Sequence, residues 1–419
     1  MKKLWSDQVL FYSMSDDYHN YFELIYDFDE QLDAAVMQKA LDTAVTRYPY
    51  FKVKLVSSHD EYMLDDNELP LLVYSDGNIP TLDPSENNGY LFRVSVSGCT
   101  LDIAFCHALS DGTSVTPFGM TIIYYYWLYK TGKAPLMPDV RLAGTPIPES
   151  EINDPTFGAS FEPSDIPVPK APQAYILPEQ PELQDGVHVY TFSIDVAPLM
   201  KYSHDIDGSP NALAALFMSR AVRAVHKDAD PVVAGIALNQ RTALKAPDAT
   251  GCHVGLMAIP YLPRMDSMDI STCATCFRGS IILKSDPDVV RSDLARAQQF
   301  HAYLSSLPTL QQKCQMSTGA VKAGISSATF SVSYTGKRSY GELDSHIRFF
   351  ATVIDMRASK IGIEIMNAGP KFFVTVNQCF RTDAYVKEFI RQFENAGIEC
   401  TGLEYSVHPY IKAPKAQQI

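Results

Sequence analysis

The feature that most constrains the fold is the segment 134–186, which holds 11 of the chain's 27 prolines. Proline lacks a backbone N–H and fixes φ, so this density excludes a long helix or a central strand. Apolar residues such as Phe157, Phe161 and Tyr175 recur in the segment, which favours an extended connector on the protein surface over a disordered tether. The chain therefore divides into a first lobe (1–133), a connector (134–186) and a second lobe (187–419).

Both lobes show an alternation of helical and strand patterns, which predicts an α/β fold with mixed sheets flanked by helices. With 419 residues, 46% of them hydrophobic, each lobe can build its own core. In the first lobe we expect helices over 32–48 and 113–132, with a strand over 101–106 that follows a hairpin. In the second lobe we expect strands over 188–194, 230–238, 254–262, 329–334, 347–354, 361–366 and 372–376, and helices over 210–226, 268–323 (a block) and 383–396.

The charge of the chain bears on its partners and its location. A net charge of −13 argues against nucleic acid as a partner, because phosphate binding needs a basic surface. Residues 1–7 carry charge but no apolar stretch like that of a signal peptide. No apolar run approaches the ~18 residues that a membrane span needs. We expect a cytoplasmic protein without a membrane span.

The hexapeptide 107–112, His-Ala-Leu-Ser-Asp-Gly, follows the predicted strand 101–106 directly. A histidine at a strand end can be held rigidly and still face a cleft, as a general base must. Gly112 suits a tight turn because it tolerates positive φ. After it, Thr113 or Ser114 is placed to cap the next helix.

This hexapeptide resembles the HxxxDG signature of the chloramphenicol acetyltransferase-like superfamily. That group includes bacterial alcohol acetyltransferases, polyketide-associated acyltransferases, plant BAHD acyltransferases and the condensation domains of peptide synthetases. The order of elements around the motif is also similar, and the resemblance covers about residues 5–405. The DFGWG motif of the plant enzymes is absent, which favours the bacterial branches. The resemblance implies two acetyltransferase-like lobes with a tunnel between them.

The resemblance also implies roles for particular residues. His107 would act as general base on an alcohol or amine that attacks an acyl thioester. Asp111 would point away from the tunnel and pair with Arg241, which ends a Gly-Ile-Ala-Leu-Asn-Gln-Arg stretch similar to the family's V-N-x-R pattern. Gly112 would let the chain turn beside the histidine. Ser333, in a Ser-Tyr-Thr-Gly segment similar to S-N-x-G, would stabilise the oxyanion, with Thr335 as second candidate and an ordinary strand end as the alternative.

The co-substrate implied is acyl-coenzyme A or an acyl-phosphopantetheine, with no permanently bound cofactor. Lys337 and Arg338 are candidates for its phosphates, although a solvated surface is the alternative. Acyl-coenzyme A is preferred because the acidic chain would repel an acidic acyl carrier protein. The alternatives are a stand-alone condensation-type enzyme with a carrier-bound donor and a non-catalytic relative that only binds a ligand. A monomer is sufficient, because two lobes of one chain can form the site.

The cysteines suggest two further possibilities. Cys106 precedes the histidine where many relatives have a second histidine, and a nucleophilic thiol there is conceivable. Cys273 and Cys276 form the only C-x-x-C, which Cys252 and His253 could complete as a metal site. We expect reduced cysteines and no metal.

Overall fold

The protein, described by a computed structural model, is built on two large sheets and one small one. The structure describes residues 2–418 except 4, 5, 16, 17, 59, 76, 78, 157, 158 and 183–185. The largest sheet has seven strands: β8 (Val187–Asp195), β9 (Val232–Asn239), β10 (Val254–Tyr261), β11 (Phe330–Tyr334), β13 (Ile361–Ala368), β14 (Lys371–Gln378) and β15 (Thr401–His408). Their spatial order is β10-β9-β11-β13-β14-β8-β15, with β11 parallel to both of its neighbours.

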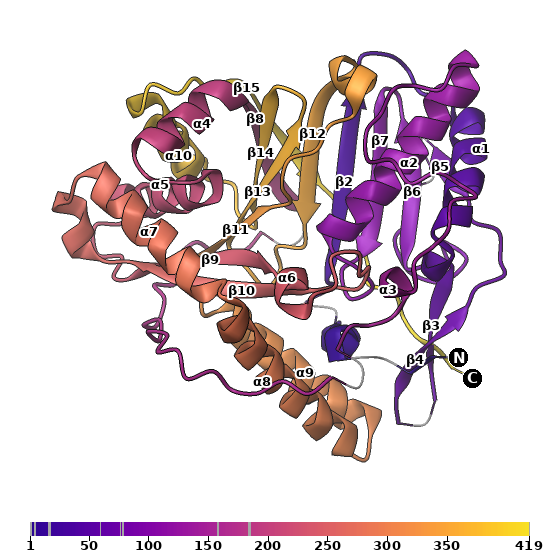
Figure 1. Ribbon diagram of the computed structural model, residues 1–419, viewed down its shortest axis with the longest axis horizontal. Coiled ribbons are helices and arrows are strands. Elements are labelled where there is room, and N and C mark those ends of the chain that lie inside the picture. The colour runs from indigo at the N-terminus through magenta and orange to yellow at the C-terminus, as the bar shows by residue number, and fades with distance from the viewer. Residues whose placement is uncertain are drawn as a thin grey trace.

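The second sheet has five strands: β2 (Tyr21–Phe28), β5 (Val73–Ser75), β6 (Phe92–Ser97), β7 (Thr100–Cys106) and β12 (Ile347–Ile354). Their order is β12-β2-β7-β6-β5. Strand β12 comes from the second half of the sequence, yet it pairs antiparallel with β2 of the first half, as Figure 1 shows. The predicted lobes therefore interlock.

A small third sheet brings the two ends of the described chain together. Its strands are β1 (Lys2–Lys3), β3 (Val53–Ser57), β4 (Tyr62–Asp66) and β16 (Gln417–Gln418). Strand β16 pairs with β3, so the C-terminal segment returns to the first lobe. Both termini accordingly lie at the same corner of Figure 1.

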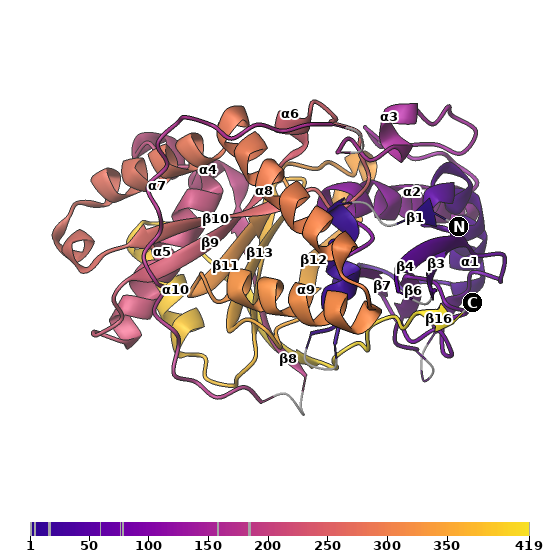
Figure 2. The same ribbon diagram turned by 90° about the horizontal axis from the view of Figure 1, so that it is seen from below.

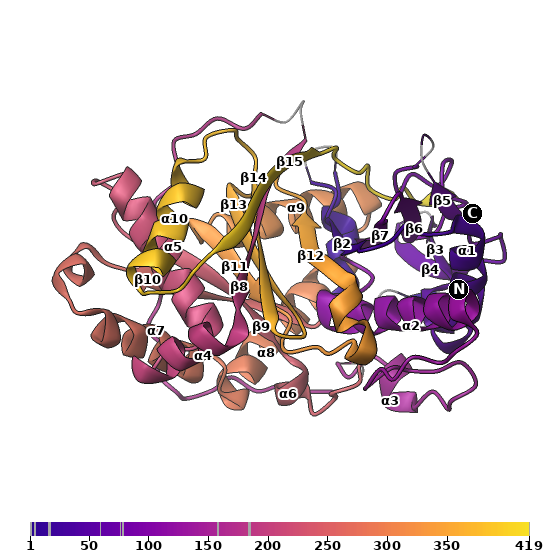
Figure 3. The ribbon, with the colours of Figure 1, turned by 90° about the horizontal axis from the view of Figure 1, so that it is seen from above.

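The helices cover the outer faces of the two large sheets. In Figure 1 helices α1 and α2 cover the five-stranded sheet, and Figure 3 shows α4, α5 and α10 against the seven-stranded sheet on the side away from β12. Helices α8 and α9 lie below both sheets in Figure 1. The helices are α1 (Ala34–Ala44), α2 (Gly112–Thr131), α3 (Glu149–Ile152), α4 (Val196–Asp205), α5 (Pro210–Val225), α6 (Arg241–Leu244), α7 (Ile270–Lys284), α8 (Pro287–Ser306), α9 (Leu310–Ile325) and α10 (Ala384–Asn395). Short 3-10 turns span Ser6–Ser13, Val45–Arg47, Pro49–Phe51, Pro263–Ser267 and Gly341–His346.

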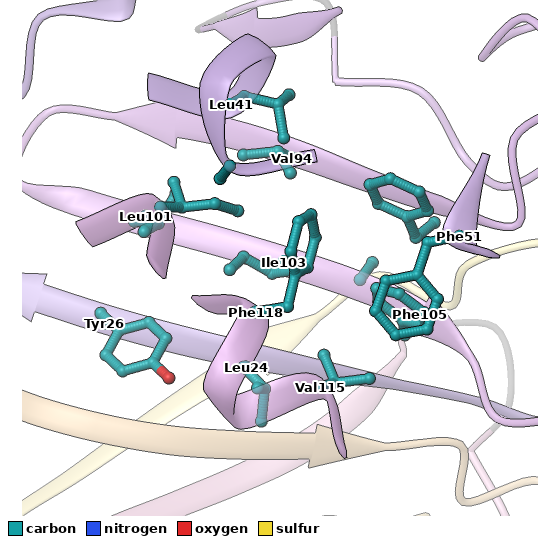
Figure 4. Packing of buried hydrophobic residues seen from close by; sticks show 14 of the residues in the cluster. Leu24, Tyr26, Leu41, Phe51, Val94, Leu101, Ile103, Phe105, Val115 and Phe118 are labelled. Carbon is teal, nitrogen blue, oxygen red and sulfur yellow. The ribbon is translucent and has the colours of Figure 1, made fainter. Parts of the chain in front are cut away.

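Each lobe has its own large hydrophobic core, as its composition predicts. In the first lobe Phe105 of β7 stacks on Phe92 of β6. Phe51, which precedes β3, meets the ring of Phe105 edge-on, and Phe118 of α2 meets the ring of Phe92 edge-on. Figure 4 shows this packing between α2 and the sheet. Burial of such large apolar side chains is the main stabilising contribution, about 1.5–3 kcal/mol for each. Because His107 follows β7 directly, this core fixes the position of the strand end that carries it.

The connector 134–186 is extended, as its prolines predict, and its only regular element among the described residues is the four-residue helix α3. Figure 2 shows it passing along α8 and α7 toward β8. Hydrogen bonds hold it: Gln298 donates to the carbonyl of Ala159 at 2.9 Å, and Tyr175 donates its N–H to the carbonyl of Pro231 at 2.8 Å. The predicted anchor Phe161 packs against a small cluster beside α6 and α8, whereas Phe157 lies outside the described residues.

Within the described part of the chain, no helix combines the length and the apolar character that a bilayer crossing requires.

Candidate active site

His107 lies at the end of β7, as the sequence predicts, and its backbone N–H donates to the carbonyl of Asn20 at 2.8 Å. Its imidazole meets the ring of Phe22 edge-on, with ring centroids 5.0 Å apart. Nδ1 of the ring lies 3.4 Å from the Sγ of Cys252, and the ring also forms a hydrogen bond with its own backbone carbonyl. This arrangement leaves Nε2 as the nitrogen with which His107 can reach a substrate.

The protonation state of His107 also suits a base. Burial lowers the pKa of His107 below its ordinary value of 6.5, while the bond to its own carbonyl and the charge of Asp111 oppose the shift. A neutral imidazole is therefore the prevailing form at neutral pH, and it can accept a proton at Nε2.

Asp111 and Arg241 form a buried ion pair between the two lobes. Arg241 Nη1 and Nη2 donate to Asp111 Oδ2 and Oδ1 at 2.8 and 3.0 Å. Their side chains are only 1% and 3% exposed. The remaining partners of the aspartate are the backbone N–H groups of Ser114 and His253. Both carboxylate oxygens of Asp111 are thus occupied by hydrogen-bond donors, an arrangement that fits the bracing role expected for it, which stays a prediction.

Arg241 holds a second loop against the motif. Its Nε donates to the carbonyl of Ala249 at 2.7 Å, and its Nη2 donates to the carbonyl of Gly251 at 2.9 Å and to Ser114 Oγ at 2.8 Å. The loop that follows α6 thus reaches Cys252, whose sulfur lies beside the imidazole of His107. One arginine therefore connects the second lobe to the strand end that carries the histidine.

The turn after His107 differs from the sequence prediction in two ways. The capping residue of α2 is Asp111, not Thr113 or Ser114: its Oδ1 accepts the N–H of Ser114. Gly112 is the first helical residue of α2, and its φ does not lie in the left-handed region. Space is the constraint at this position: a Cβ would lie 3.1 Å from Cγ2 of Thr335, so the Thr335 side chain would have to shift to admit it. Gly112 thus lets the Thr335 segment approach α2.

A cavity of about 300 Å³ opens beside His107, between the two large sheets. The five-stranded sheet and its turn contribute Phe22, His107 and Gly112, and the seven-stranded sheet contributes Ser333 and Leu256. His107 is partly exposed, in keeping with a ring that borders open space. Apart from Arg241, which binds the loop, the structure brings together at one cavity the residues predicted to carry the chemistry: His107, Asp111, Gly112, Ser333 and Thr335.

The cavity also contains a residue that the sequence analysis missed, Glu364 of β13. It is 7% exposed, and it lies in register with Ser333 of the neighbouring strand β11. Burial raises the pKa of Glu364 to about 8, and a hydrogen bond with the Ser333 hydroxyl opposes the rise. The sequence feature that could have revealed it is a single glutamate within the apolar run Ile361–Met366. Burial of a carboxyl group is costly, so a glutamate in a buried strand often has a specific role.

The predicted phosphate-binding pair does not border this cavity. Lys337 is exposed, and Arg338 packs beside the start of α2, with its Nη2 3.4 Å from the carbonyl of Thr113. Both follow the Ser333 segment by a few residues, so their role toward a phosphorylated co-substrate stays a prediction.

The structure gives the surroundings of the cysteines for which the sequence suggested a nucleophile or a metal site. Cys106 is fully buried beside the sulfur of Met14, and burial raises the pKa of its thiol to about 12, which disfavours the nucleophilic thiolate. Among the described residues, no three histidine, cysteine or acidic side chains gather as a metal site would require. Cys252 instead contacts His107.

Comparison with known proteins supports the fold. No family model matches the chain, and no curated protein matches its sequence. Among solved structures it is similar to polyketide synthase associated protein 5 from Mycobacterium tuberculosis (12% identity, TM-score 0.61, covering 93% of this chain and 96% of that one). It is also similar to TRI101 of F. graminearum, solved with coenzyme A and deoxynivalenol (11% identity, TM-score 0.60, covering 94% of this chain and 98% of that one). A third similar structure is the epimerization domain from the third module of tyrocidine synthetase B (12% identity, TM-score 0.57, covering 94% of this chain and 96% of that one).

The fold is therefore that of the chloramphenicol acetyltransferase-like and condensation-domain superfamily, as the HxxxDG motif predicts. The similarity covers 94% of the chain for TRI101 and for the epimerization domain, and condensation domains of polyketide synthases are also among the similar structures. At 11–12% identity the likeness establishes the fold, and the chemistry has to be argued from the site itself.

Proposed function

We propose that the protein transfers an acyl group from a thioester, preferably acyl-coenzyme A, to the hydroxyl or amine of a small acceptor. The observation that carries the proposal is His107: a neutral imidazole at the border of an interlobe cavity, with its Nδ1 side occupied and Nε2 available. A base in this position can deprotonate an acceptor that enters the cavity.

The reaction follows from the groups around the cavity. The acceptor O–H or N–H gives its proton to His107 Nε2 as the oxygen or nitrogen attacks the thioester carbonyl. The resulting oxyanion accepts a hydrogen bond from Ser333 or Thr335, which border the cavity opposite α2. The carbon–sulfur bond then breaks, and the protonated His107 returns the proton to the departing sulfur. The products are an ester or amide and a free thiol.

Two further polar groups support a substrate in this space. Asn20 Nδ2 and Thr352 Oγ1 are buried and have no hydrogen-bond partner within the described chain, and both residues line the cavity. Buried polar atoms are normally paired, so these two are suited to bind polar atoms of the bound substrates. Most other lining residues are apolar, among them Leu24, Leu256 and Ile354.

Coenzyme A as donor is supported by TRI101, a similar fold solved with coenzyme A. The carrier-bound alternative is supported by the condensation domain that mediates chain release from the enacyloxin polyketide synthase, which is also similar (TM-score 0.51). The residues of one chain line the cavity, so the proposal needs no second copy. The cytoplasmic location stays a prediction from the sequence.

The test is thiol release by the wild-type protein. Acetyl-, octanoyl- and palmitoyl-coenzyme A, and the matching acyl-pantetheines, are each combined with 1-octanol or octylamine, and the free thiol is measured. Release that depends on the acceptor and favours the coenzyme A donors supports the proposal. Release only from pantetheine donors would favour the carrier-bound alternative, and no release by the folded protein would favour a binding role.

A further inference from the structure

The cavity contains a carboxyl group that the reaction described above does not use. Glu364 lies in the middle of β13, with Ser333 of β11 and Thr375 of β14 as its register partners on either side. It borders the same cavity as His107. The side chains of these three register partners stand on one face of the sheet, because neighbouring residues in register point the same way.

Glu364 differs from the other acids at the cavity. Asp111 pairs with Arg241, and Asp355 pairs with Arg357, whose Nε lies 2.9 Å from Asp355 Oδ1. Within the described part of the chain, by contrast, no lysine or arginine forms an ion pair with Glu364, and its hydrogen bond is to the hydroxyl of Ser333.

This environment keeps the carboxyl group neutral. Burial without a cation raises the pKa of Glu364 to about 8. At pH 7 the group is therefore a carboxylic acid with one O–H to donate. The hydroxyl that acts on it is that of Ser333, its register partner on β11 and the first candidate for the oxyanion.

We propose that Glu364 is a positioning residue that donates its O–H to Ser333 Oγ and thereby turns the Ser333 hydroxyl proton toward the oxyanion. A hydroxyl oxygen that accepts one hydrogen bond still donates its own proton. The inference rests on the proposed acyl transfer, because it assigns the group that orients the oxyanion donor of that reaction. No bond to Glu364 forms or breaks, and its proton stays in place during turnover.

Ionisation of Glu364 reverses this arrangement. The carboxylate has no proton to donate, so it accepts the hydrogen bond of the Ser333 hydroxyl and withdraws that proton from the oxyanion. Activity therefore falls as the pH rises through about 8, by roughly tenfold per pH unit beyond it.

The tyrosines and the histidine at the cavity have pKa values shifted away from this range. Burial raises the pKa values of Tyr18, Tyr21 and Tyr334 above 10, and the pKa of His107 is lowered from 6.5. Asp111 and Asp355 are bound to arginines. Glu364 is thus the cavity-lining group whose pKa is raised to about 8. The thiol of Cys252 also lies beside His107, and Glu364→Gln separates the two groups, because a limb that came from the thiol would persist in that variant.

The experiment measures the pH dependence of kcat between pH 5 and 10, with the donor and acceptor that the thiol-release panel selects. Glu364→Gln keeps a donor to Ser333 Oγ at every pH, and we expect it to retain activity at pH 7 and lose the alkaline limb. Glu364→Ala should lower kcat at pH 7 on the order of tenfold. Ser333→Ala should also lack the limb, because Glu364 acts through that hydroxyl. The control is Glu404→Gln on the exposed edge strand β15 of the same sheet, which should keep the wild-type profile.

Three results would overturn the inference. An active wild type without an alkaline limb, a limb that persists in Glu364→Gln, or a limb that persists in Ser333→Ala would each remove the role of Glu364 and leave the acyl transfer intact. Failure of the acyl transfer itself shows separately, as absence of thiol release from the wild type at every pH. An infrared difference spectrum between the wild type and Glu364→Gln at pH 7 adds a readout that needs no activity. The band of a protonated carboxyl should be stronger in the wild type, while Glu23, whose pKa is also raised by burial, contributes equally to both proteins. Equal bands in the two proteins would also overturn the inference.

Discussion

The ion pair between Asp111 and Arg241 should contribute to both stability and activity, because it joins the two lobes directly behind His107. Asp111 accepts four hydrogen bonds, two from Arg241 at 2.8 and 3.0 Å and two from the backbone N–H groups of Ser114 and His253. Both side chains are almost completely buried. Removal of one partner from such a pair leaves the other charge unpaired in the interior, which costs about 3–5 kcal/mol.

We therefore expect Asp111→Ala and Arg241→Ala each to lower the free energy of unfolding by about 3–5 kcal/mol. The double variant should be no more than about 1 kcal/mol less stable than the worse single variant, because no unpaired charge remains. Arg241→Ala also releases the carbonyls of Ala249 and Gly251, so it should disturb the loop that carries Cys252.

The assay is urea denaturation followed by circular dichroism, with thiol release measured on the same samples. The matched control is Arg278→Ala, which removes an exposed ion pair with Asp207 and should change stability by less than about 1 kcal/mol. If either buried single variant loses less than about 1 kcal/mol, or if the two losses add fully in the double variant, the brace described here is wrong.

Three further predictions concern the motif itself. Gly112→Ala should lower kcat/KM at least tenfold, about 1.4 kcal/mol, because its Cβ would lie 3.1 Å from Thr335 Cγ2. Since the backbone at residue 112 is helical, the loss of stability in urea should stay below about 2 kcal/mol. An unchanged kcat/KM would contradict this prediction. Burial lowers the pKa of His107 from 6.5, so the base is lost only as the pH falls through a value below 6.5. The acid limb of thiol release should therefore have its midpoint below pH 6.5, and a midpoint above pH 6.5 would refute the assigned environment. Cys106→Ala should retain thiol release within about tenfold, because burial raises the pKa of this thiol to about 12, whereas complete loss in a folded variant would identify it as the nucleophile.

Local patterns in the sequence predicted most of the elements and the place of His107. Period-two alternation predicts β7, and the end of that strand puts His107 where the chain turns. The prolines of 134–186 predict the extended connector, whereas the bounds of the two lobes stay a prediction. The contact between Asp111 and Arg241 was expected from the resemblance alone, since 130 residues separate them.

Features that depend on long-range packing were not predictable in the same way. Strand β12 has the pattern of any buried strand, and only the folded chain shows that it pairs with β2 across the lobe boundary. The physical reason predicted for Gly112 was wrong. Its φ does not lie in the left-handed region, and the constraint is instead the approach of Thr335. Glu364 was overlooked because its significance depends on Ser333 in the next strand, which no local pattern shows.

The central claim is that His107 is the base of an acyl transfer in the interlobe cavity. The most direct test incubates the protein with an isotopically labelled acyl-coenzyme A and an alcohol or amine acceptor, and identifies the acylated acceptor by mass spectrometry. The comparison is between wild type, His107→Ala and the control His204→Ala, which replaces an exposed histidine of α4. We predict a labelled ester or amide from the wild type and from His204→Ala, and a rate about 10²–10⁴-fold lower for a folded His107→Ala. Equal product formation by His107→Ala and the wild type would contradict the account.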